Sequence, residues 1–369
     1  MLFDTTHARS RRPQRGRWIA GVITAVAMAA ALGVTATPAS AVTSKDPALV
    51  GLFGSTDPTY DGVYRQSLSL IALDAADAKI PDSAVGWLKR QRCGNGSYTS
   101  YRADLSTSCG PKDSNATALA VIAFKRLGHG KLARGSVDWL LDQQTASGGW
   151  EYTKGWGADS NSTGLVVQAL IAMKIDPATV TKKGSSPLDF LSSLQLDCDN
   201  DPAGDRGALD YQSQDPLLAN DFATAQATAA LAGKSLPVRP APASDERPAF
   251  TCDAQPQPTP AAAAAGYLGR TIRANDGHIP YFDDSIDYGS TANAVLSLVA
   301  AGYASKQIKA ATKTLRTGSV DYTHDDADKV LTASSAALAL VALATGGDPR
   351  SFGDVNPVRQ ILKSQIKAG

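Results

Sequence analysis

The sequence predicts an all-α fold, an α/α toroid (α/α barrel) of about six helical hairpins, because two kinds of segment recur along it. In the first kind an Asp or Asn is followed four residues later by Thr and then by an Ala/Leu/Val run, and this pattern occurs five times. The second kind is amphipathic and carries an aromatic-Leu pair. A hairpin of one segment of each kind cannot bury its apolar face alone. The hairpins must therefore stack, and six of them can close into a ring.

The first kind of segment is predicted to form the inner helices. Asp and Thr four residues apart lie on one face of a helix, and an Asp at the helix start can accept hydrogen bonds from free backbone N–H groups. The run that follows is apolar on every side, long and rich in Ala, which favours a buried helix over a strand. The copies are Asp113–Thr117, Asp159–Thr163, Asn220–Thr224, Asp287–Thr291 and Asp328–Thr332, with a degenerate one at Tyr60–Gln66.

The second kind of segment is predicted to form the outer helices, which alternate with the inner ones. Each leads into a loop that contains Gly or Asp and ends in an aromatic residue, such as Trp150 or Tyr281. The outer segments are Trp87–Gln91, Trp139–Gln144, Phe190–Gln195, Tyr267–Leu268, the more divergent Ile308–Leu315, and Pro357–Ile366.

The N-terminus has the pattern of an export signal. Arginines precede an apolar run from Trp18 to about Val34, and Pro38-Ala39-Ser40-Ala41 follows as a small-x-small cleavage site. A transmembrane anchor is the alternative, but the run is diluted with Ala and Gly and the cleavage site follows directly. We predict that residues 1–41 are a cleaved signal peptide. Residues 42–369 would then form a secreted, extracellular toroid domain without stable membrane insertion.

The four cysteines are predicted to form two disulfides, Cys93–Cys109 and Cys198–Cys252. An even count in an exported chain favours disulfides, and neither pair has the further ligands of a zinc site. The Pro-rich stretch 237–260 is predicted to be an inserted loop tied back by the second bridge; a domain linker is the alternative, but the repeat continues in register after it. The net charge of +1 provides no overall field to attract nucleic acid.

One hairpin resembles a known repeat. Its sequence, RGSVDWLLDQQTASGGW from Arg134 to Trp150, resembles the QW repeat of terpene cyclases and of the β subunits of protein prenyltransferases, the prenyltransferase and squalene oxidase repeat superfamily. Within that superfamily, the inner segments Tyr64–Leu73 and Thr224–Lys234 are most similar to the helical domain of secreted cobalamin carriers, the transcobalamin and intrinsic factor group. The resemblance covers nearly all of residues 46–369 and implies the toroid fold, with either isoprenoid chemistry or corrinoid binding.

The chemical signatures of enzymes on this fold are incomplete in the sequence. A terpene cyclase needs an Asp-x-Asp-Asp acid in an aromatic-lined cavity, and the nearest strings, at 283–287, 325–328 and 197–201, have the wrong order. Prenyl transfer would need a zinc site of Asp, Cys and His. Glycoside hydrolysis needs two facing carboxylates, which the helix starts could supply, but a feature that recurs in every repeat suits helix capping better. We therefore predict no catalytic residue, no cofactor and no resident metal.

The preferred interpretation is a non-catalytic binding protein whose small-molecule ligand lies in the barrel mouth. Hydroxyl and aromatic groups there would suit a corrinoid, an isoprenoid or a saccharide. Capping and loop anchoring are the alternative roles of these residues. A terpene cyclase-like, isoprenoid-processing enzyme and a surface protein-interaction module are the alternative functions. The candidate ligand-binding residues are Asp113, Thr117, Trp150, Asp159, Thr163, Asp221, Tyr281, Asp287, Thr291 and Asp328.

Overall fold

The computed structural model describes residues 43–199, 202–253 and 255–369. The predicted signal peptide, residues 1–41, lies outside the described residues. Within the described ranges, no helix is both long and apolar enough to span a membrane.

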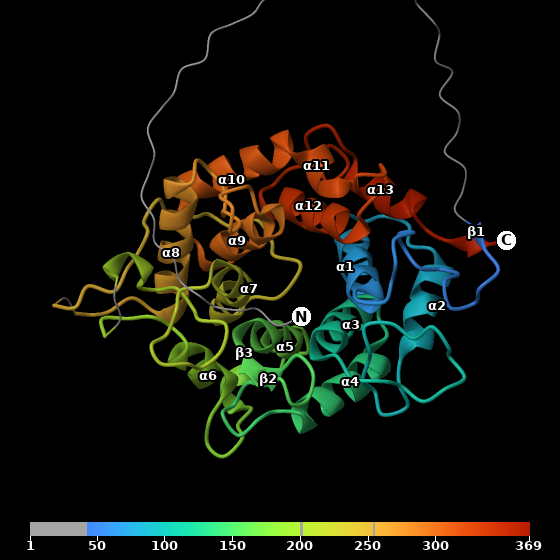
Figure 1. The fold of residues 1–369 in the computed structure, drawn as a ribbon, viewed down its shortest axis with the longest axis horizontal. Helices are drawn as coiled ribbons and strands as arrows, with labels where there is room; N and C mark the ends of the chain where they lie inside the picture. Colours follow the sequence, from blue (N-terminus) through green and yellow to red (C-terminus); the bar gives the residue numbers. More distant parts are fainter. Residues whose placement is uncertain (1–42, 200–201, 254) are drawn as a thin grey trace, which may run out of the picture. The chain divides into compact units, whose positions relative to one another are not determined.

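Six helices form a closed inner ring (Figure 1). Each contacts the next along the chain, and the last of them packs against the first. Most of their side chains are buried, as their Ala/Leu/Val runs predict. The inner helices are α1 (Gly62–Ala75), α3 (Ser114–Arg126), α5 (Ser160–Ala172), α7 (Asp221–Leu231), α9 (Tyr288–Ala301) and α12 (Thr332–Ala344). The predicted α/α toroid of helical hairpins is confirmed.

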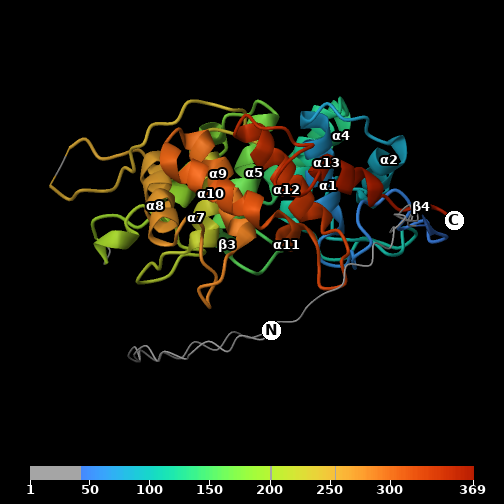
Figure 2. The ribbon, with the colours of Figure 1, turned by 90° about the horizontal axis from the view of Figure 1, so that it is seen from above.

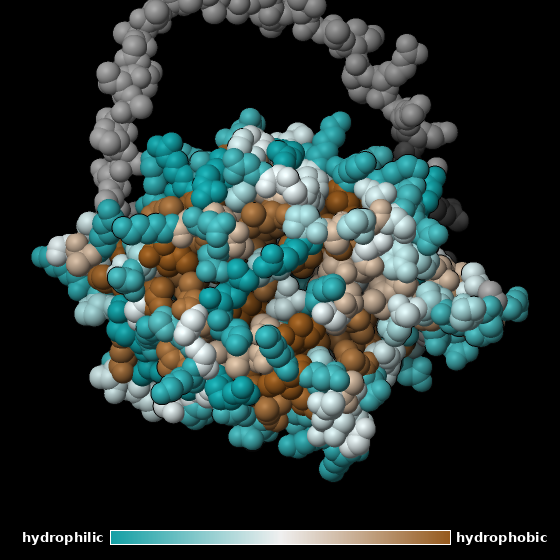
Figure 3. Space-filling view, turned by 180° about the vertical axis from the view of Figure 1, so that it is seen from behind, coloured by the Kyte–Doolittle hydropathy of each residue, from teal (hydrophilic) through white to brown (hydrophobic). Residues whose placement is uncertain are grey.

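An outer layer of helices surrounds this ring. Each outer helix packs against the inner helix that precedes it in the chain, and the short α11 (Ser319–Thr323) precedes α12. On the face opposite to that of Figure 1, hydrophobic side chains lie mainly over the ring and hydrophilic ones toward its edge (Figure 3). The outer helices are α2 (Asp82–Gln91), α4 (Gly130–Asp142), α6 (Pro187–Ser193), α8 (Pro260–Ala274), α10 (Ser305–Thr317) and α13 (Pro357–Lys363).

Short strands and 3-10 turns complete the connections. β1 (Thr43–Ser44) pairs in parallel with β4 (Lys367–Ala368), with Thr43 opposite Lys367, so the two ends of the described domain lie side by side. β2 (Trp150–Glu151) pairs antiparallel with β3 (Ala158–Asp159), directly before α5. The 3-10 turns are η1 (Pro177–Thr179) and η2 (Ala203–Asp205).

The capping role expected of the repeated Asp or Asn is confirmed at four inner helices. Asp113, Asp159, Asn220 and Asp287 are the N-cap residues of α3, α5, α7 and α9, and each side chain accepts a backbone N–H from the residue three positions on. These bonds satisfy donors that a helix start otherwise leaves free.

The register predicted for the last copy was wrong. Leu331, not Asp328, is the N-cap of α12, and Asp328 lies in the exposed loop before it with a φ of 58°. Ser335, four residues after this cap, donates its hydroxyl to the carbonyl of Leu331 at 3.2 Å. Ser335 therefore takes the place that the pattern assigned to Thr332.

Both predicted disulfides are present, Cys93–Cys109 and Cys198–Cys252. The long connection from α7 to α8 contains no helix among its described residues and projects beyond α8 in the edge-on view (Figure 2). It is tied to the α9–α10 turn, where the Ala304 N–H donates to the Glu246 carbonyl at 3.0 Å.

Candidate functional site

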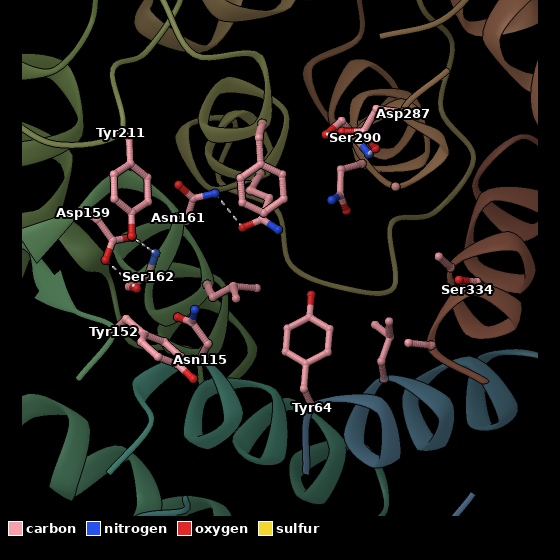
Figure 4. Close-up of a pocket in the computed structure, with 18 of the residues that line it drawn as sticks. Tyr64, Asn115, Tyr152, Asp159, Asn161, Ser162, Tyr211, Asp287, Ser290 and Ser334 are labelled. Atoms are coloured by element: carbon pink, nitrogen blue, oxygen red, sulfur yellow. Dashed lines mark hydrogen bonds between the residues drawn. The ribbon is translucent and has the colours of Figure 1, made fainter. Parts of the chain in front are cut away.

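A cavity of about 400 Å³ lies where the inner helices begin, and we call this end of the ring the mouth. All six inner helices contribute to its wall, and the connections before α5 and α7 add Tyr152 and Tyr211 (Figure 4). A smaller chamber of about 40 Å³ shares Tyr64 with it and reaches Gln168 and Leu340, further along the inner helices.

Helical periodicity explains which residues reach this cavity. Positions two and six residues after a capping residue are four apart and so share one helix face. Four copies place Asn115, Asn161, Phe222 and Gly289 at the first position, and three place Leu165, Gln226 and Asn293 at the second. None of these residues was among the predicted site residues. A polar side chain at these positions was the signal that could have identified Asn115, Asn161, Gln226 and Asn293, whereas Phe222, Gly289 and Leu165 carry no such signal.

Tyrosine rings form much of the cavity wall. Tyr64 points from α1 into the cavity, and Tyr152 and Tyr211 face it from the side of α5 (Figure 4). Burial, followed by the charge of Asp113, raises the pKa of Tyr64 to about 12. Burial also raises the pKa of Tyr152 and of Tyr211. All three phenols therefore stay protonated at neutral pH and offer a ligand hydroxyl groups and ring faces.

Two carboxylates reach the wall, Asp159 and Asp287. Each accepts the N–H and the hydroxyl of the serine three residues on, at 2.7 and 2.8 Å from Ser162 and at 2.8 and 2.5 Å from Ser290. Burial raises the pKa of Asp159 above its ordinary value, although these bonds oppose the shift. Because capping holds both carboxylates in place, each presents its negative charge at a fixed position on the cavity wall.

Amide oxygens on the wall lack partners within the described protein. Asn161 and Gln168 are each only 4% exposed, and Asn161 Oδ1 and Gln168 Oε1 accept no hydrogen bond. Asn115 Oδ1 likewise is buried and accepts no hydrogen bond within the described residues. Asn161 Nδ2 donates to Gln226 Oε1 at 2.9 Å, which fixes the Asn161 amide. A buried acceptor without a donor costs about 1–3 kcal/mol, so groups of this kind point to a site that a ligand completes.

Positive charge is missing from the wall. No lysine, arginine or histidine is among the described residues that line the cavity or its chamber. The loops before α9 and α12 add negative charge, with Asp283 and Asp284 in the first and Asp325 and Asp326 in the second. In the described part of the chain, no group of His, Cys, Asp or Glu could hold a metal. The site suits a hydrogen-bond donor that is neutral or positively charged, and it disfavours an anion.

The predicted threonines lie behind the cavity wall. Thr117, Thr163 and Thr291 are fully buried and do not line the cavity. Their Oγ1 atoms accept the backbone N–H of Tyr98 at 3.0 Å, of Trp150 at 2.9 Å and of Ile279 at 2.9 Å, respectively. The repeated Thr therefore ties the preceding loop to the inner helix. Asp159 and Asp287 are the predicted site residues that the cavity brings together.

The other predicted site residues have structural contacts or lie in exposed loops. Trp150 is fully buried and donates Nε1–H to the Leu140 carbonyl at 2.6 Å. Asp113 accepts the Ala116 N–H and the Ser100 hydroxyl, and Asp221 accepts the Tyr267 hydroxyl at 2.6 Å. Tyr281 is 56% exposed and packs edge-on against Phe282. Asp113, Trp150, Asp221, Tyr281 and Asp328 do not line the cavity.

Comparison with known proteins identifies the fold. No protein-family model matches the chain, and no curated protein sequence matches it. An α-amylase from Clostridium perfringens shares 10% identity over 76% of this chain and 85% of its own, with a TM-score of 0.51. The family 76 glycoside hydrolase (mannosidase) Bt3792 from Bacteroides thetaiotaomicron shares 10% identity over 82% and 93%, with a TM-score of 0.50. The type II terpene cyclase MstE from Scytonema shares 16% identity over 69% and 68%, with a TM-score of 0.45. At such identities the likeness concerns the fold alone.

Proposed function

We propose that this chain is a secreted, non-catalytic binding protein that holds a saccharide in the central cavity. The observation that carries this proposal is the set of buried amide oxygens, on Asn161 and Gln168, that have no partner within the described residues and lie beside tyrosine rings. Hydroxyl groups of a sugar can donate to such oxygens while its ring packs on the aromatic faces. Two disulfides support an extracellular location.

The other ligand classes fit the wall less well. An isoprenoid diphosphate needs cationic partners, and the described lining has none. The likeness of two inner segments to cobalamin carriers makes a corrinoid a candidate, but a cavity of about 400 Å³ is at the small end of ligand sites and suits one or two sugar rings better.

The arrangement of the carboxylates supports binding without catalysis. A glycosidase uses one carboxylic acid to protonate the leaving group and a second carboxylate as base or nucleophile. Asp159 and Asp287 instead repeat one capping geometry, each with both oxygens bonded to a serine of its own helix. This shared capping role suits a fixed polar rim, because both carboxylates are engaged by the start of their own helix.

A protein-interaction module is the second candidate, because apolar side chains surround the mouth. Within the described ranges, every large hydrophobic side chain that is exposed lies on the connection into an inner helix or in its first turn. These residues are Tyr60, Trp156, Tyr211, Leu218, Phe222, Tyr281, Phe282 and Val320. Such a rim could extend a saccharide site to an oligosaccharide, or it could contact a protein partner.

The test is a thermal-shift screen of the mature protein against mono- and oligosaccharides, corrinoids and isoprenoid diphosphates, followed by calorimetric titration and product analysis. We expect saturable saccharide binding without turnover. Ala333→Trp, which places an indole in the cavity wall on α12, should abolish binding, whereas Ala310→Trp on the exposed side of α10 should not. Stabilisation by an isoprenoid diphosphate with product formation would overturn the proposal.

A further inference from the structure

We infer that the ligand carries a positively charged ammonium group, as an amino sugar does, and that this group binds beside Asp159 and Asn161. The inference rests on the proposed function and adds a charge to it. We call Asp159, Asn161, Tyr152 and Tyr211 the ammonium subsite. All four line the cavity on the side of α5 (Figure 4).

The chemistry of the ammonium subsite matches that of a cationic donor. An ammonium group has three N–H donors and no acceptor, and the subsite offers acceptors without a basic side chain. Asn161 Oδ1 is buried and unpartnered within the described protein, and the bond from Asn161 Nδ2 to Gln226 Oε1 holds the amide in this orientation. The rings of Tyr152 and Tyr211 add faces that attract a cation. A neutral hydroxyl would use only the hydrogen-bonding part of this arrangement.

Among the described residues, the buried carboxylate of Asp159 has no cationic partner, whereas the more exposed Asp61 has one. At the start of α1, Asp61 forms an ion pair with Arg65 at 2.6 Å, and the Arg65 side chain is almost fully buried. None of the ion pairs among the described residues includes Asp159 or Asp287. Burial of an unpaired carboxylate is unfavourable, and a cationic ligand would offset that cost.

The surrounding loops favour the same ligand charge. The connections into α9 and α12 carry Asp283, Asp284, Asp325, Asp326 and Asp328, and their basic residues are His278, His324 and Lys329. Negative potential over a concave site raises the local concentration of cations and speeds their association, in a way that salt weakens. The negative charge at the rim and the negative charge in the cavity therefore both favour a cationic ligand.

The experiment compares probes that differ only at one ring substituent. Glucosamine, glucose and glucuronic acid are titrated calorimetrically into the mature protein at neutral pH, and mannosamine and galactosamine are compared with mannose and galactose in the same way. We expect at least one amino sugar to bind about tenfold more tightly than its neutral parent, with an advantage that shrinks as salt is added, and glucuronic acid to bind most weakly. N-acetylglucosamine, which lacks the charge, should lose the advantage.

Two variants test whether the preference for the amino sugar depends on the charge of Asp159. Asp159→Asn keeps a side chain that can cap α5 but removes the charge, so the preference for the amino sugar should fall toward unity. Asp176→Asn, at the exposed N-cap of η1, is the matched control and should leave the preference intact. If Asp159→Asn does not fold, the salt dependence and the acetylated probe still decide the question for the unaltered chain.

The outcomes separate the two proposals. Equal affinity for an amino sugar and its neutral parent would overturn the ammonium inference and leave saccharide binding standing. Tighter binding of glucuronic acid would overturn the inference as well. If neither amino nor neutral saccharides bind, the proposed function itself fails.

Discussion

Gln168→Met is expected to stabilise the protein, although it replaces a buried polar residue of an inner helix. Gln168 Oε1 has no hydrogen-bond partner within the described residues, and Leu165, Leu236 and Leu340 line the same chamber. Methionine has nearly the length and helix propensity of glutamine. Removing an unsatisfied buried acceptor should therefore raise the free energy of unfolding by about 1–2 kcal/mol.

Gln66→Met is the matched control, because the same exchange on α1 removes bonds that are made. Gln66 is fully buried; its Oε1 accepts the Phe53 N–H at 2.8 Å, and its Nε2 donates to the carbonyls of Gly51 and Ala84 at 3.1 and 2.9 Å. The substitution would leave the buried Phe53 N–H unpaired and would remove a donor from the carbonyls of Gly51 and Ala84. At about 1 kcal/mol for each lost bond plus the desolvation of the free N–H, we expect a loss of about 3 kcal/mol or more.

Guanidinium and thermal unfolding, followed by circular dichroism with the disulfides intact, measure both variants. The informative result is the opposite sign of the two changes. If Gln168→Met destabilises the protein as Gln66→Met does, then Gln168 has a structural partner. Gln168 would then no longer support the proposal that a ligand completes the cavity wall. A saccharide that binds the unaltered protein should bind Gln168→Met more weakly, so that gained stability accompanies lost affinity.

Three further predictions concern the hydrogen bond of Thr163, the disulfide Cys93–Cys109 and the carboxylate of Asp159. Thr163→Val keeps the shape of the side chain but leaves the buried Trp150 N–H without its acceptor, and unfolding should show a loss of about 1–3 kcal/mol with no change in m-value. Serine at Cys93 and Cys109 opens a bridge with a sequence separation of 16, and the loss, about 3 kcal/mol, should match that caused by reducing this bridge. Burial raises the folded-state pKa of Asp159 above its ordinary 3.8, so the stability linked to this group is complete below that pH and declines as pH rises through the raised pKa. Asp159→Asn should therefore gain stability relative to the unaltered protein as pH rises from about 4 to 7, and an unchanged difference across that range would contradict the shift.

Local sequence patterns were sufficient to predict the helical hairpins and the two disulfides. The alternation of apolar runs with amphipathic segments indicated the two layers of helices, and the spacing of Asp113 and Asp159 before such runs indicated caps. The even set of cysteines indicated Cys93–Cys109 and Cys198–Cys252. These features depend on residues that are close in the chain or on the chemistry of a single residue type.

The last repeat shows where a local pattern is insufficient. An Asp four residues before a Thr occurs at Asp328, but α12 begins only after Leu331. The hydroxyl of Ser335 lies within hydrogen-bond distance of the Leu331 carbonyl and of Gln360 Oε1 on α13, so it contacts a separate helix. The choice between two possible helix starts was therefore made by tertiary packing, which the spacing does not contain.

Periodicity and capping act within a few residues, so a ring of helical hairpins with capped inner helices could be predicted from the sequence. The sequence did not determine which side chains form the cavity. On an inner helix that is apolar all round, the face toward the axis is set only when its neighbours and its outer helix are in place. In the tertiary structure, Asn161, Gln168 and Gln226 face the central cavity or its chamber, whereas Thr163 faces the loop at Trp150, whose N–H it accepts. The polar composition of the cavity wall follows from this packing, since burial leaves those amide groups few protein partners other than each other.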